Sequence, residues 1–102
     1  MTGGELLDEC ASVEKPGFDL TEKQKLHQSW CLSYIQGITE GLLIYGGSCR
    51  PGLICLPEHY NYLQMARVVV KYLHAHPESH HLGAVVLIPL AYQKDFPCET
   101  RK

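Results

Sequence analysis

Residues 21–47, TEKQKLHQSWCLSYIQGITEGLLIYGG, predict a long amphipathic helix. It opens on Thr21-Glu22-Lys23-Gln24, a capping box in which two side chains pair with the free backbone N–H groups of a helix start. Large apolar residues then recur about every four positions and share one face; they are Leu26, Trp30, Tyr34, Ile38, Leu42 and Tyr45. Gly46-Gly47 ends the pattern, as glycine commonly does. We expect this face, including Trp30, to lie in the core.

Two glycines inside this helix need a reason, because glycine costs about 0.5–1 kcal/mol relative to alanine in a helix interior. Gly37 and Gly41 form a Gly-x-x-x-Gly pattern, which in a membrane suggests helix dimerisation. The helix also carries several charged and amide side chains, so a membrane role is disfavoured. We expect the glycines to form a flat strip where a neighbouring helix backbone approaches closely.

Three further helices are predicted around this one. The first covers about residues 4–13 and is broken by Pro16-Gly17. Another starts near Pro57-Glu58, since proline suits the first turn of a helix, and ends at His76. The last starts at Pro77-Glu78 and contains Pro89, which should kink it. β-Branched runs at 68–70 and 85–86 would also suit strands, but the helical period over longer windows outweighs them.

The five cysteines suggest how such a small domain is reinforced. Cys10 and Cys31 lie on inward-leaning faces of the first two helices and could form one bridge. Cys55 and Cys98 flank the last two helices, and antiparallel packing would bring them together. Each bridge would add about 3–4 kcal/mol. Four cysteines allow three pairings, and buried free thiols are the alternative; Cys49 could be free, pair with Cys55 or join two chains. The predicted fold is therefore an all-α, four-helix domain spanning residues 1–102, stapled by two disulfides.

Composition limits the partners. The chain is 45% hydrophobic and 20% charged with a net charge of −2, as expected of one folded domain. Its nine Lys and Arg residues are scattered, which argues against nucleic acid as a partner. The longest apolar run, residues 85–92, is too short to cross a bilayer. The first residues lack a secretion signal, so the sequence is either cytosolic or a mature form, and disulfides favour the latter.

Catalytic and metal-binding signatures are weak. His74, His76, His80 and His81 surround Pro77, but this spacing does not place two ligands on one helix face, so no metal is expected. Serine-hydrolase, phosphate-loop and zinc-protease motifs are absent from the sequence. We expect no enzyme, no catalytic residue and no cofactor. A thiol or metal enzyme built around Cys49 and the histidines is the alternative.

Four short motifs, in order, resemble the Rap/Tai family of resistance-associated and amidase-immunity proteins of type VI secretion systems. They are CLSYIQG at 31–37, CLP at 55–57, YLxxHPE at 72–78 and FPC at 96–98. The resemblance runs from about Leu6 to Cys98. It implies a small helical periplasmic protein, often dimeric, that binds and neutralises a cognate secreted toxin. For several family members that toxin is a peptidoglycan amidase. The sequence departs from the family at Pro89 and in a loop around Cys49 that looks longer than is typical.

The expected toxin-binding site is the glycine-containing loop before Cys55, because such loops often carry recognition. Its candidate contact residues are Gly47, Ser48, Arg50, Leu53 and Ile54. A merely connecting loop is the alternative. For the protein as a whole, a periplasmic acid-stress chaperone is the second candidate function, with six histidines to supply a charge change on acidification.

Overall fold

A computed structural model describes residues 1–13, 19–42 and 54–97. Within these ranges the chain forms four α-helices and one 3₁₀ turn: α1 (Gly3–Glu9), α2 (Glu22–Gly41), α4 (Tyr62–Ala75), η3 (Pro77–Ser79) and α5 (Ala84–Asp95). No strand occurs in the described ranges, where β pairing is limited to the isolated bridges Thr2–Gly83 and Ile54–Pro97. The predicted all-α, four-helix fold is confirmed for these residues.

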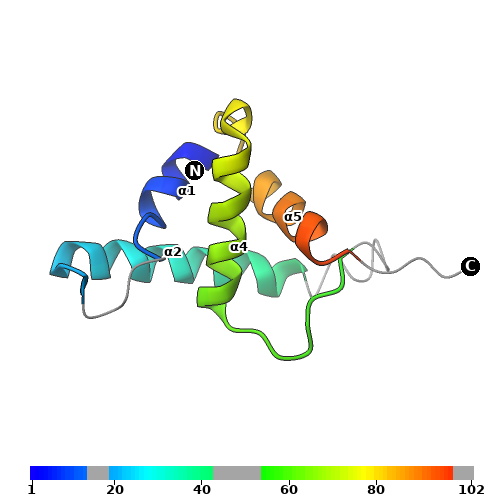
Figure 1. The fold of residues 1–102 in the computed structure, drawn as a ribbon, viewed down its shortest axis with the longest axis horizontal. Helices are drawn as coiled ribbons and strands as arrows, with labels where there is room; N and C mark the ends of the chain where they lie inside the picture. Colours follow the sequence, from blue (N-terminus) through cyan, green and yellow to red (C-terminus); the bar gives the residue numbers. More distant parts are fainter. Residues whose placement is uncertain (14–18, 43–53, 98–102) are drawn as a thin grey trace, which may run out of the picture.

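Helix α4 stands at the centre of the arrangement (Figure 1) and packs against each of the other three α-helices. In the view of Figure 1, α1 is seen to one side of α4 and α5 to the other, and α2 crosses α4; α1 and α5 nevertheless contact each other. The inward side chains of α4 are Met65, Ala66, Val69, Val70 and Leu73. Their spacing is that of one helix face, which makes α4 the core element of the fold.

The start of α4 differs from the prediction, which placed it at Pro57-Glu58. The helix begins at Tyr62 because Asn61 is its N-cap, and the Asn61 side chain accepts a 2.8 Å hydrogen bond from the Gln64 N–H. The last helix also begins later than predicted. Pro77 opens only a 3₁₀ turn, and α5 starts after Gly83. At the start of α5 the Met1 carbonyl accepts a 2.8 Å hydrogen bond from the Ala84 N–H. This cap joins residues far apart in the sequence, so no local pattern predicts it.

Helix α2 begins as predicted. Thr21 Oγ1 accepts from the Gln24 N–H at 3.1 Å, and Gln24 Oε1 accepts from the Thr21 N–H at 3.0 Å. Its buried row, however, is Cys31, Ile35 and Thr39.

The predicted burial of Trp30 is wrong, since Leu26 and Trp30 are 50% and 51% exposed. In Figure 1 the N-terminal part of α2 projects beyond α4, so fewer elements are available to cover it. Tyr34, Ile38 and Leu42 are partly buried against the core.

The glycine prediction for α2 is also wrong. Among the described residues, no atom lies within 4 Å of a Cβ added at Gly37 or Gly41, so no described helix backbone approaches either position closely. Close approach occurs instead at Gly3, where an added Cβ would overlap the side chain of Leu87. Gly3 therefore allows α1 to lie directly against α5.

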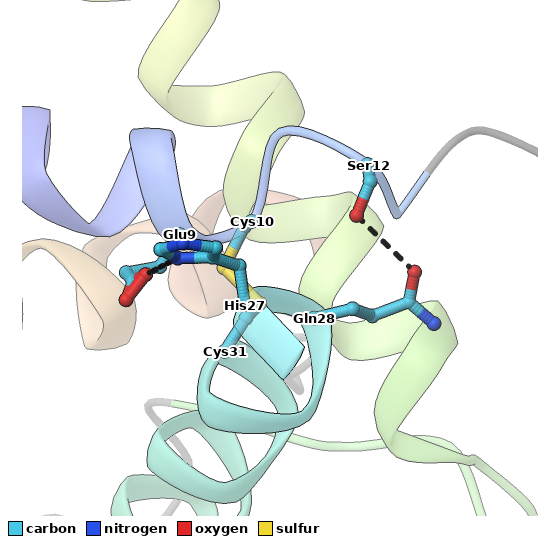
Figure 2. Close-up of a disulfide and its surroundings, with 6 residues drawn as sticks. All are labelled: Glu9, Cys10, Ser12, His27, Gln28 and Cys31. Atoms are coloured by element: carbon cyan, nitrogen blue, oxygen red, sulfur yellow. Dashed lines mark hydrogen bonds and ion pairs between the residues drawn. A yellow bond between two sulfur atoms is a disulfide. The ribbon is translucent and has the colours of Figure 1, made fainter. Parts of the chain in front are cut away.

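The predicted Cys10–Cys31 disulfide is confirmed, and both cysteines are buried. It links the C-cap of α1 to the middle of α2 across 21 positions of sequence, with the two Cα atoms 5.2 Å apart. Two polar contacts flank it (Figure 2): His27 Nδ1 donates to Glu9 Oε2 at 2.5 Å, and Ser12 Oγ donates to Gln28 Oε1 at 3.4 Å.

The second predicted bridge, Cys55–Cys98, includes Cys98, which lies outside the described residues. Cys49 lies outside them as well. Cys55 is itself a disulfide cysteine. Cys10–Cys31 is thus the one bridge that has both cysteines among the described residues.

Candidate protein-binding surface

The toxin-binding loop predicted from the sequence falls largely outside the described residues. Gly47, Ser48, Arg50 and Leu53 lie there, as part of 43–53. Ile54 is described, and it is half-buried rather than exposed. It packs against the core and forms a β-bridge with Pro97, so its role in the described structure is to hold the chain in place.

Helix α5 is apolar on two opposite sides, which is unusual for a helix at the surface. The inner side is buried and consists of Ala84, Leu87, Ile88, Ala91 and Tyr92. The other side, with the preceding residue Leu82, forms what we call the α5 outer face: Leu82, Val85, Val86 and Leu90, exposed by 39%, 57%, 52% and 38%. A run of neighbouring exposed apolar side chains is typical of a surface that binds another molecule.

Pro89 lies on the same side of α5 and does not end the helix, which continues to Asp95. Because proline has no N–H, the Val85 carbonyl loses its usual partner in the helix. Val85 is more than half exposed, so this side of α5 faces water. The proline is thus placed on the side of the helix where its cost is smallest.

A shallow hollow of about 300 Å³ borders the C-terminal part of the α5 outer face. Its lining residues are Tyr72, His76, Leu90, Gln93 and Lys94. His76 is held at this edge between two neighbours: its ring centroid is 4.3 Å from that of Tyr72, and its Nδ1 lies 3.1 Å from Glu78 Oε2. A backbone hydrogen bond, and then the bond to His76, hold the pKa of Glu78 below its usual value. The edge therefore carries an exposed carboxylate beside the apolar surface.

A second concavity, of about 860 Å³, lies between α1 and the start of α2. Its acidic lining residues are Glu5, Asp8 and Glu9, and Lys23 and His27 face it from α2. The Glu9 carboxylate is already bonded to His27. Every buried polar side-chain atom in the described residues has a hydrogen-bond partner, so none is left to mark a ligand here.

Thr39 and Tyr92 form a buried polar pair in the core, and its role is structural. Thr39 Oγ1 donates to the Ile35 carbonyl at 2.7 Å, so the Tyr92 hydroxyl, 2.6 Å away, donates to Thr39. Burial raises the pKa of Tyr92 to about 12, although the hydrogen bond to Thr39 acts in the opposite direction. Tyr92 thus stays neutral at physiological pH and joins α5 to α2.

The histidines do not converge on a common centre. His76 faces Glu78, whereas His80 Nε2 donates to the Leu73 carbonyl at 2.6 Å. Among the described residues no group of three or more His, Cys, Asp and Glu could hold a metal ion. In the same part of the chain, no helix has the length and apolar character needed to cross a membrane.

The described residues thus form a cross-linked helical core with an apolar outer face on α5. The chain belongs to the Rap1a immunity protein family, because a family model described as Rap1a immunity proteins matches residues 2–98. This confirms the resemblance seen in the four sequence motifs. No curated protein and no solved structure shows significant similarity to the chain.

The sequence pattern does not predict the α5 outer face. The apolar residues Leu82, Val85 and Val86 predict only the last helix. The available signal was the segment AVVLIPLAY at 84–92, which is apolar all round and has more apolar residues than one buried face can use.

Proposed function

We propose that this protein is the periplasmic immunity partner of a secreted toxin, and that it acts by binding the toxin and not by catalysis. The observation that carries the proposal is the family match over residues 2–98. The resemblance to amidase-immunity proteins makes a peptidoglycan amidase of a type VI secretion system the proposed target. Occluding the active site of such an enzyme would protect the cell wall of the producer.

The periplasmic location is supported by the cross-linked core. The buried Cys10–Cys31 bridge joins two helices, and stable disulfides belong to oxidising compartments. We also assign the partner of Cys55 as Cys98. The Cys55 N–H donates to the Phe96 carbonyl at 2.8 Å, and Ile54 pairs with Pro97, so Cys55 lies next to the residues that precede Cys98.

The loop before Cys55 remains the proposed toxin contact. Arg50 and Leu53 combine a charge and an apolar side chain, which suits insertion into a polar-rimmed cleft. Ile54, at the end of this segment, is anchored through Pro97 and the core.

The test is protection of a bacterium that expresses a candidate peptidoglycan amidase toxin, taken from a gene next to the one for this chain, with a periplasmic signal. Wild-type protein should restore growth and should co-purify with the toxin. Arg50→Glu combined with Leu53→Asp should weaken both. The matched control combines Lys71→Glu with Leu26→Asp, which makes the same kinds of change at two exposed helix positions.

Three results would contradict the proposal in different ways. Equal protection by the loop variant would remove the loop from the mechanism. A toxin that the wild-type protein neither binds nor neutralises would remove that toxin as the partner. Suppression of client aggregation at low pH, without a single tight partner, would favour the chaperone function instead.

A further inference from the structure

The outward side of α5 changes from apolar to polar along the helix. Its residues form two rows with a four-residue spacing, and residues at this spacing share one side of a helix. Both rows begin with apolar residues and end with a polar one: Val85, Pro89 and Gln93 form the first row, and Val86, Leu90 and Lys94 form the second. The α5 outer face therefore leads to an amide and an ammonium group near the C-terminal end of the helix.

The polar end of these rows has two side chains that are available to a partner. Gln93 and Lys94 line the hollow of about 300 Å³, and neither makes a hydrogen bond or ion pair with another described residue. The rings of Tyr72 and His76 line the same hollow, and the nearby Glu78 carboxylate is already bonded to His76. The hollow therefore suits an acidic side chain, whose carboxylate would accept hydrogen bonds from the ammonium and the amide.

The same end of α5 adjoins the base of the proposed toxin-binding loop (Figure 1). Phe96 and Pro97, which follow the helix directly, pair with Cys55 and Ile54 through a 2.8 Å hydrogen bond and a β-bridge. Ile54 is the last of the candidate contact residues of that loop. A toxin bound there would therefore lie beside the C-terminal end of α5.

We propose that the α5 outer face is a second contact surface for the toxin, and that the hollow beside it receives an acidic side chain of the toxin. This inference rests on the proposed function. A specific interface buries about 800 Å² of each partner and uses about 20–30 residues a side. The few candidate residues of the loop fall well below this size. The α5 outer face enlarges the contact and has the apolar centre and polar rim of an interface.

The two surfaces have different tasks. The loop enters the active site and blocks catalysis, whereas the α5 outer face lies outside the active site and supplies affinity. Helix α5 is fixed from its inner side, because that side is buried and the Tyr92 hydroxyl is bonded to Thr39 of α2. Apolar side chains on a fixed helix lose little conformational freedom on binding, which favours affinity.

A lipid surface is a poorer occupant of the α5 outer face. Helices that lie on membranes carry several Lys and Arg residues on their polar side. Helix α5 has one basic residue, Lys94, and Asp95 follows it directly. A protein surface with an apolar centre and an acidic edge matches this helix better.

The experiment measures binding of the full-length oxidised protein to the purified candidate amidase by surface plasmon resonance, together with inhibition of peptidoglycan hydrolysis. Val86→Asp places a charge in the apolar part of the contact and should raise the Kd about 100-fold, mainly through faster dissociation. The concentration for half-maximal inhibition should rise by the same factor, without a change in the inhibition reached at saturation. Leu26→Asp makes a similar change on α2, at a side chain of similar exposure, and should leave the Kd unchanged.

Two further variants test the hollow and identify the occupant. Lys94→Glu should raise the Kd several-fold and reduce the salt dependence of the association rate, whereas the exposed Lys25→Glu on α2 should change both less. Replacing Val85 by the photoreactive p-benzoylphenylalanine should cross-link the protein to the toxin in the complex. Circular dichroism and the melting temperature show that each variant is folded.

Unchanged toxin affinity in Val86→Asp, beside a wild type that binds and inhibits, would overturn this inference and leave the proposed function intact. Cross-links from position 85 to a second copy of the chain, and none to the toxin, would also overturn it. Equal effects of Lys94→Glu and Lys25→Glu would remove the hollow from the contact. A wild type that neither binds nor inhibits the amidase would overturn both the inference and the proposed target.

Discussion

Removing the buried cross-link should cost this small domain much of its stability. Replacing Cys10 and Cys31 together by alanine opens a loop of 21 positions, for which the chain-entropy relation gives about 3 kcal/mol. A domain of this length has roughly 5–15 kcal/mol of stability in total. The double variant should therefore remain folded at 25 °C and melt about 10–20 °C lower.

The assay is urea unfolding followed by circular dichroism, in parallel with a thermal scan. The m value should rise, because the unfolded chain without the bridge exposes more surface. Ser12→Ala is the matched control at the same helix junction. It removes only the 3.4 Å hydrogen bond to Gln28 and should cost about 1 kcal/mol or less. A loss below 1 kcal/mol in the double cysteine variant would refute the view that this bridge holds α1 on α2.

Two further predictions follow from the packing of the core. Gly3→Ala should destabilise the fold by about 1–3 kcal/mol, because the new methyl group overlaps the side chain of Leu87. Gly37→Ala should stabilise it by about 0.5–1 kcal/mol, because no described atom lies near the new methyl group and alanine has the higher helix propensity. Equal melting temperatures for the two variants would contradict this prediction. Tyr92 has a folded-state pKa of about 12, above the unfolded value of 10, so its contribution is complete below pH 10 and is lost as the pH rises toward 12. Tyr92→Phe should cost about 1 kcal/mol at neutral pH and should flatten this alkaline loss; parallel stability curves for both proteins between pH 9 and 11.5 would show that another group is responsible.

The exposed row on α2 is a separate feature of the surface. Leu26 and Trp30 lie in the N-terminal half of α2 and are about half exposed, and the Trp30 ring makes an edge contact with the His27 ring at a centroid distance of 5.3 Å. His27 in turn is bonded to Glu9 of α1. This chain of contacts holds Trp30 beside the helix junction that the disulfide secures.

Local signals in the sequence predicted four helices, although not where the last two begin, and pointed to a Cys10–Cys31 bridge among three possible pairings. The capping box at Thr21 joins two residues only three positions apart, so it does not depend on distant parts of the fold and can be predicted from the sequence. Cys10 and Cys31 could be paired because each lies on an inward-leaning face of a neighbouring helix. The family could likewise be identified from short ordered motifs, and the model match over residues 2–98 agrees.

Only the tertiary structure decided which sides of those helices are buried. Two apolar rows on α2 have the same four-residue period, and the row of Cys31, Ile35 and Thr39 is inside because the disulfide and the Tyr92 hydroxyl hold it there. The α5 outer face could not be distinguished from its inner face by pattern, since both are apolar. The physical reason is that the spacing of apolar residues along the sequence shows which side chains share a helix face. Whether that face is buried depends on which element, distant in the sequence, packs against it.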